Sequence, residues 1–222
     1  MVKVIVDRNL FGRALKFLSI LRDDVKFVVE GGELKTKAIE IGRVAYGEVV
    51  LKAESNVDSF EFATNITRLG DAVGKMKGDE KITIEKKEGH IVVKCGKVIY
   101  RIADYADVND VPPINLEYKS RYRMNGNEFK EIIGLVSKVD DVVEFGRAIS
   151  ATGDFETLKI DVEGEVEEGD EAKYSMEFLN MLAKRVDKDD DVLVEFGKNK
   201  PVKITLSGEG YKFVYVLAPR VD

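Results

Sequence analysis

The sequence contains no tryptophan and no glutamine, and it has one cysteine, one histidine and four prolines. A single cysteine excludes an intramolecular disulfide, and the alternating stretch around Cys95 predicts a small, packed or half-exposed side chain there. There is no apolar run of roughly 18 residues and no charged-then-apolar leader, so we expect neither a membrane span nor a signal peptide. These absences favour a cytoplasmic protein.

Residues with the chemistry of a reaction centre are also scarce. His90 lies beside a glycine at an expected turn, and no serine or cysteine is placed with it as a nucleophile. No glycine loop that cradles phosphate is present, and the acidic stretch 163–171 matches no calcium-binding loop. We therefore expect no catalytic residue, no metal site and no cofactor, and we interpret the acidic stretch as a solvated loop.

What the chain does contain is an internal repeat. Residues 65–103 predict a helix, a charged turn and three short strands, and residues 175–218 repeat that order. A helix followed by a strand precedes each copy, at 9–29 and at 127–145. A proline-containing segment between the copies reads as an extended linker. The sequence thus predicts two domains, 1–104 and 121–222, joined by a linker at 105–120.

The four expected helices are amphipathic and carry basic side chains opposite their apolar stripes. Their expected N-caps are Asn9, Asn65 or Thr64, Asn125 or Asn127, and Ser175. The chain carries a net charge of -6, which argues against a polyanionic partner until its distribution is considered. Nine basic residues lie in the helical segments against four acidic ones, which predicts a basic face and an acidic face. The nine are Arg13, Lys16, Arg68, Lys75, Lys77, Lys130, Lys138, Lys184 and Arg185.

Several segments together resemble proliferating cell nuclear antigen (PCNA), the archaeal and eukaryotic sliding clamp. They are the C-terminal Leu217–Asp222, the strand after Pro201, the linker residues 111–113 and the helix-strand repeat. The resemblance covers the whole chain. It implies an α+β fold of two duplicated clamp domains, with helices on one face and antiparallel sheets on the other, assembled as a three-subunit ring around duplex DNA. Implied partners are DNA polymerase, clamp loader, flap nuclease and ligase, and self or paralogous subunits.

The resemblance also implies a groove beneath the linker that receives a short peptide with two aromatic residues. Without the resemblance, Ile39, Val44 and Val216 are equally well interpreted as core positions. An apolar groove with a mobile lid suits an aromatic-anchored peptide. The implied groove residues are Ile39, Arg43, Val44, Val111, Pro113, Pro201, Val216, Ala218 and Pro219.

Ring closure is expected to use two strongly β-forming stretches, 97–103 and 155–162, which the resemblance puts at opposite ends of a subunit. An uncovered strand edge invites pairing with another chain. The expected interface residues are Val98, Tyr100, Ile102, Phe155, Leu158 and Ile160.

Two alternatives stay open. Asp71 and Glu131 fall where the clamp family tends to carry cations, which weakens the expected DNA contact and leaves room for a divergent paralogue, one subunit of a mixed ring or a clamp from a mobile element. The first alternative function is a clamp-fold adaptor or decoy that binds clamp partners without encircling DNA. A small hydrolase on a duplicated scaffold is the weaker alternative. Carboxylate pairs are plentiful in so acidic a chain, so their presence alone carries almost no weight for acid/base catalysis.

Overall fold

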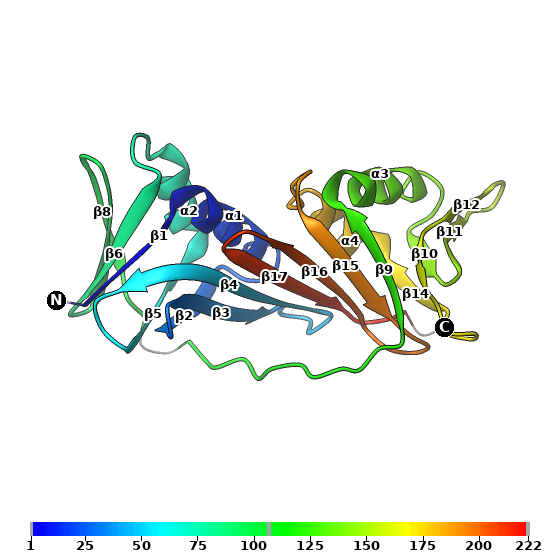
Figure 1. Cartoon of the computed structure of the whole chain (residues 1–222), viewed down its shortest axis with the longest axis horizontal. Helices are drawn as coiled ribbons and strands as arrows, with labels where there is room; N and C mark the ends of the chain where they lie inside the picture. The colour runs from blue at the N-terminus through cyan, green and yellow to red at the C-terminus, as the bar shows by residue number, and fades with distance from the viewer. Residues whose placement is uncertain (1, 106–107, 221–222) are drawn as a thin grey trace. The chain divides into compact units, whose positions relative to one another are not determined.

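The computed structural model describes residues 2–105 and 108–220 (Figure 1). Linker residues 106 and 107 and the terminal Val221 and Asp222 lie outside this description. The chain is α+β, with four α-helices and antiparallel sheets in the described part, which confirms the expected fold class. It divides into two compact units, Met1–Ile41, Gly47–Pro113 and Glu209–Phe213 in the first, and Gly42–Tyr46, Ile114–Gly208 and Val214–Asp222 in the second.

In the first unit, helices α1 (Arg8–Leu18) and α2 (Ile66–Lys75) lie side by side on one face of the strands (Figure 1). The strand order is β5-β2-β3-β4-β1-β6-β7-β8. The bounds are β1 (Val2–Asp7), β2 (Asp24–Glu30), β3 (Glu33–Ile39), β4 (Ala45–Ser55), β5 (Ser59–Asn65), β6 (Lys81–Lys87), β7 (His90–Cys95) and β8 (Val98–Ala103).

The second unit repeats this plan with helices α3 (Gly126–Val136) and α4 (Met176–Ala183). Its strands form the orders β13-β9-β15-β16-β17 and β12-β11-β10-β14. The bounds are β9 (Ser120–Asn125), β10 (Val142–Phe145), β11 (Ala148–Thr152), β12 (Thr157–Asp161), β13 (Gly164–Glu165), β14 (Ala172–Ser175), β15 (Asp191–Phe196), β16 (Val202–Gly208) and β17 (Tyr211–Leu217).

The repeat extends to the core. Phe11 and Phe129 are each the fourth residue of their helix and are fully buried. Phe27 on β2 and Phe145 on β10 follow them at the same sequence spacing and are also fully buried. Phe11, Phe27 and Phe62 form a cluster of aromatic rings in the first unit, and Phe145 contacts the rings of Tyr122, Tyr174 and Phe196 in the second. Equivalent large side chains therefore organise both cores.

The N-cap residues of α2, α3 and α4 are among those expected from the sequence, and the N-cap of α1 is a different residue. Asn65 and Asn125 accept hydrogen bonds from the amides three residues on, as expected. In α1 the cap is Asp7, which accepts from the Leu10 amide at 2.8 Å, and not Asn9. The difference arises because β1 continues to Asp7, so the chain turns directly from strand into helix. Ser175 precedes α4 without a side-chain capping bond.

The acidic stretch 163–171 is more structured than the solvated loop that we expected. Its residues 164–165 form β13, which pairs with β9. Glu165 lies 2.6 Å from Arg121 and Glu167 lies 2.9 Å from Lys119, both measured between charged atoms. Two carboxylates of this stretch, Glu165 and Glu167, thus meet cations at and beside β9. Among residues 2–105 and 108–220 there is no helix long and apolar enough to span a membrane.

Candidate functional site

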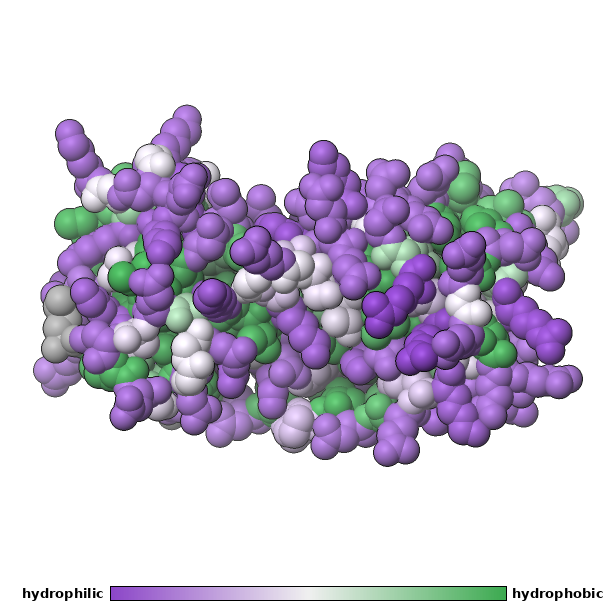
Figure 2. Space-filling model, viewed as in Figure 1, coloured by the Kyte–Doolittle hydropathy of each residue, from purple (hydrophilic) through white to green (hydrophobic). Residues whose placement is uncertain are grey.

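The exposed sides of the helices carry most of the basic residues singled out in the sequence. Lys16 on α1, Arg68 and Lys75 on α2, and Lys130 on α3 are exposed, opposite the buried stripe of each helix. Figure 2 shows hydrophilic residues along most of the helical side of each unit. Lys77, Lys138, Lys184 and Arg185 lie just beyond the helix ends. Each unit therefore presents cations on its helical face, interspersed with exposed carboxylates on the same helices, Asp71, Glu128, Glu131 and Glu177.

Two of these basic residues are packed against the protein. The Arg13 guanidinium lies 4.8 Å from the centroid of the Tyr211 ring and 5.6 Å from that of Phe213. It therefore holds residues 209–213 onto α1 by a cation–π contact. The Nε atom of Arg185 is buried. The contact of Arg13 is not visible in helical spacing, because Tyr211 and Phe213 lie outside the helices.

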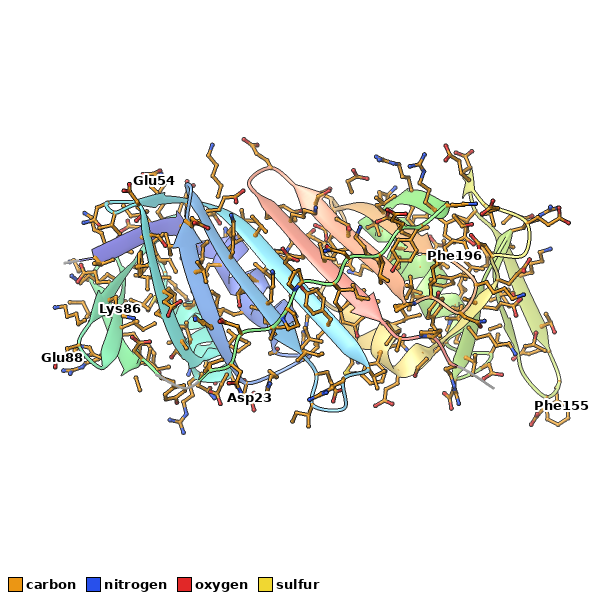
Figure 3. All side chains as sticks on the ribbon, turned by 90° about the horizontal axis from the view of Figure 1, so that it is seen from below. Asp23, Glu54, Lys86, Glu88, Phe155 and Phe196 are labelled. Atoms are coloured by element: carbon orange, nitrogen blue, oxygen red, sulfur yellow. The ribbon has the colours of Figure 1, made fainter. Side chains whose placement is uncertain are left out.

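The two strands expected at a subunit seam are both edge strands. In the described chain β8 pairs with β7 alone, and β12 pairs with β11 alone. Ile99 and Val98 on β8 are 68% and 43% exposed. Phe155 is 100% exposed at the turn before β12, and it projects from the hairpin tip (Figure 3). Each open edge therefore has exposed large apolar side chains beside it, the feature that the expected seam requires.

The register shows which backbone groups face outward. At the turn between β11 and β12, Gly153 donates its amide to the Glu156 carbonyl at 2.9 Å, so these two residues form a hydrogen-bonded pair. Hydrogen-bonded and non-hydrogen-bonded pairs alternate along an antiparallel ladder. Counting from the turn, Ser150 and Lys159 are therefore a non-hydrogen-bonded pair. The N–H and C=O of Lys159 thus point to the open side of β12. On β8, the two-residue turn after Cys95 makes Cys95 and Val98 a hydrogen-bonded pair, and the same alternation makes Val92 and Arg101 a non-hydrogen-bonded pair. The backbone N–H and C=O of Arg101 thus also point to the open side of the strand.

The other expected seam residues differ in backbone pairing and in burial. Tyr100 faces Val93 in a hydrogen-bonded pair, so its backbone is committed to β7. Ile102 is buried, whereas Leu158 and Ile160 are half-buried.

The linker is anchored near both of its ends. Asp104 accepts the Ala63 amide at 2.9 Å and pairs with Lys86 at 3.1 Å. Asp110 pairs with Lys26 of β2 at 3.1 Å. At the other end, the Tyr118 hydroxyl donates to the carbonyl of Pro201 at 2.8 Å, and burial raises the pKa of Tyr118.

Two cavities border the linker in the first unit. One, of about 290 Å³, lies between linker residues 109–111 and the outward face of β2 and β3. It has Val111 in its wall, an expected groove residue, together with Lys26, Val28, Lys35, Thr36 and Lys37. The second, of about 860 Å³, is lined by Leu21, Asp23, Asp24, Ile41, Tyr105 and Val108, among others. Ile39 is half-buried and Pro113 is exposed, and neither lines these cavities.

Two of the expected peptide-groove residues in the second unit, Val44 and Ala218, are neighbours. The Ala218 amide donates to the Val44 carbonyl at 2.9 Å, which brings the start of β4 beside the C-terminal segment. Val44 is 37% exposed, whereas Val216 is buried at 5%. Pro201 and Pro219 are half-buried and Arg43 is exposed. Val44 is therefore accessible to a ligand and Val216 packs in the core.

Sequence reasoning missed the lysines at 26, 35 and 37. Their alternate spacing on neighbouring strands was the available signal, since alternate residues share one face of a sheet. In the described chain no group of three or more His, Cys, Asp or Glu side chains could hold a metal ion. The described surfaces offer exposed cations, open strand edges and a groove.

No protein-family model matches the chain. The DNA polymerase sliding clamps of Methanothrix thermoacetophila and Methanocella arvoryzae are 25% and 24% identical to it, each over 100% of this chain and 99% of the relative. A structure of A. fulgidus PCNA with the C-terminal region of FEN-1 bound has a TM-score of 0.89 at 23% identity, covering 100% of this chain and 99% of that one. A PCNA2–PCNA3 complex from Sulfolobus tokodaii has a TM-score of 0.83 at 20% identity, over 100% of both chains.

The chain therefore has the fold of the DNA sliding clamps. Along its whole length it is similar to archaeal DNA polymerase sliding clamps, which confirms the resemblance inferred from the sequence.

Proposed function

We propose that this chain is a subunit of a sliding clamp, a ring that encircles duplex DNA and tethers replication and repair enzymes. The observation that carries the proposal is its full-length similarity to proteins named DNA polymerase sliding clamp. Basic helical faces and open edge strands in the same chain support it. The proposed role is non-enzymatic and is exercised at the nucleoid.

A closed ring stays on DNA because it surrounds the duplex, so its helices need only weak contacts with the phosphates. Sequence-blind phosphate contacts permit sliding, whereas contacts to base edges would stall it. We assign the phosphate contacts to the exposed cations Lys16, Arg68, Lys75, Lys130 and Lys184. The exposed carboxylates between them weaken each contact, which is compatible with a ring that does not rely on affinity.

The domain assignment remains 1–104 and 121–222, with 105–120 as the connecting linker. The anchors at Asp104 and Tyr118 support these boundaries. We place partner docking at two surfaces, one beside the linker in the first unit, which includes Val111, and one beside the C-terminal segment in the second unit, which includes Val44. A. fulgidus PCNA has been solved with the C-terminal region of FEN-1 bound, and we propose that this chain likewise binds peptides from flap nuclease, polymerase, ligase and clamp loader.

Topological retention tests the function directly. The fluorescently labelled protein, loaded by its clamp loader on a nicked circular plasmid, is expected to stay bound through gel filtration. Cutting the plasmid once should release it, because a ring slides off a free end. Equal retention on circular and linear DNA would contradict encirclement and favour an adaptor that does not surround DNA.

The lysines can be tested by the salt dependence of DNA binding. Changing Lys16, Lys130 and Lys184 to Ala should lower the slope of log affinity against log salt by about 0.9 for each phosphate that is no longer neutralised. The control replaces Lys52, Lys87 and Lys212, which are exposed residues on strands. Equal slopes in both triple variants would remove these three helix-associated lysines from the path of the DNA.

A further inference from the structure

The groove beneath linker residues 109–111 is bordered by cations as well as apolar side chains. Val28 and Val111 supply apolar walls, and the ammonium groups of Lys26, Lys35 and Lys37 come from adjacent strands. Aromatic anchors alone do not require such a set of cations. The groove is therefore built for a ligand that carries negative charge next to an apolar group.

The lysines differ in how far they are already neutralised. Lys26 lies 2.8 Å from Glu61 and 3.1 Å from Asp110, between charged atoms. Lys35 lies 2.9 Å from Glu33. Within residues 2–105 and 108–220, the ammonium group of Lys37 has no hydrogen-bonding or ion-pair partner, although the residue is half-buried.

Asp110 has the position of an internal competitor for these cations. It belongs to the linker, its side chain is 84% exposed, and its carboxylate reaches across the groove to Lys26. An ion pair this exposed is screened by water and contributes little to stability. A carboxylate from another molecule can therefore take its place at small cost.

We propose that this groove binds an Asp or Glu side chain of a partner peptide, next to its apolar anchor. The carboxylate pairs with Lys37 and displaces Asp110 from Lys26. The linker thus supplies an internal carboxylate, Asp110, which occupies Lys26 when no partner is bound. This inference rests on the proposed function, because it specifies the chemistry of peptides that dock beside the linker.

Competing occupants fit less well. A basic peptide would place like charges against three lysines, and the nearby Glu33 and Glu61 are each already paired with one of them. A purely apolar peptide would bury Lys37 without a partner, which costs desolvation free energy. An acidic residue satisfies Lys37 and leaves the existing ion pairs of Glu33 and Glu61 intact.

The test compares two peptides by calorimetry with the full-length protein. Both carry a pair of aromatic anchors, and they differ only in a Glu or a Gln beside the anchors. The wild-type protein is expected to bind the Glu peptide roughly three- to fivefold more tightly, the effect of one partly exposed ion pair. This preference should fall in 1 M salt, because exposed charges are then screened.

Variants locate the effect. Lys37→Gln should remove the preference for Glu and leave the affinity for the Gln peptide unchanged. Asp110→Asn should increase the preference, because the internal carboxylate no longer competes. Lys52→Gln changes an exposed lysine of β4 that does not line this groove, and it should behave as wild type.

The outcomes separate the two proposals. Equal affinity for both peptides in the wild type, or a preference that survives Lys37→Gln, would overturn the carboxylate site while leaving peptide docking intact. Failure of both peptides to bind would overturn docking beside the linker and the carboxylate site with it. Topological retention on circular DNA is independent of either result.

Discussion

Ring closure through the two open edges is most sharply tested at Lys159. Its backbone N–H points to the open side of β12, so Lys159→Pro removes a donor from the seam without removing one from the β11–β12 ladder. The pyrrolidine ring also obstructs an approaching strand. A proline on an edge strand is tolerated when its missing N–H faced solvent, so the isolated subunit should still fold.

The size of the effect follows from the length of the seam. β12 has five residues, so about three outward-facing positions are available for pairing. Losing two hydrogen bonds around Lys159 should cost about 1–3 kcal/mol, at about 0.5–1.5 kcal/mol for each bond. The dissociation constant of the subunits should therefore rise roughly 5- to 150-fold.

Light scattering over a dilution series measures this shift as a change from assembled to monomeric mass. Lys159→Ala keeps the N–H and is the matched control for loss of the charge. Arg101→Pro should have the same effect from the β8 side, whereas Tyr100→Pro should damage the β7–β8 ladder. Urea midpoints show whether each variant still folds. Assembly of folded Lys159→Pro and Arg101→Pro at wild-type concentrations would refute the seam.

Two further results are expected. Val44→Asp or Val111→Asp should weaken binding of an aromatic-anchored peptide at least about tenfold, because a carboxylate would be buried against the ligand's rings; calorimetry measures this, and wild-type affinity in both variants would place docking elsewhere. Tyr122→Phe should lower the free energy of unfolding by about 1–3 kcal/mol, since the buried Tyr122 hydroxyl donates to the Gly146 carbonyl and accepts its amide. Denaturant titration checks the second, and an unchanged midpoint with an unchanged slope would show that the bonds contribute no net stability.

The sequence was sufficient for the repeat and its helices, because apolar periodicity and capping residues are local. The sequence was less informative where a contact or a helix start depends on residues far apart in the chain or on the extent of a neighbouring strand. Both Asp7 and Asn9 can cap a helix, and only the extent of β1 selects Asp7. The contact of Arg13 with Tyr211 depends on a segment far along the chain that belongs to the same compact unit. The ion pair between Lys26 and Asp110 joins residues far apart in the sequence, for which no local pattern exists.

The arginines and lysines of the helical faces differ in their contacts, and this difference affects how the proposed ring moves along DNA. Arginine has a planar, pre-organised fork that binds phosphate in a fixed geometry, whereas lysine is a point charge on a flexible stem. On the helical faces Arg13 is stacked on an aromatic ring and Arg185 is partly buried, whereas Lys16, Lys130 and Lys184 are exposed. The cations that we propose contact DNA are thus mainly lysines, which bind phosphate without a fixed geometry; Arg68 is the exception. Contacts of this kind are exchanged from one phosphate to the next with little cost, so a closed ring can retain DNA without fixing its position on it.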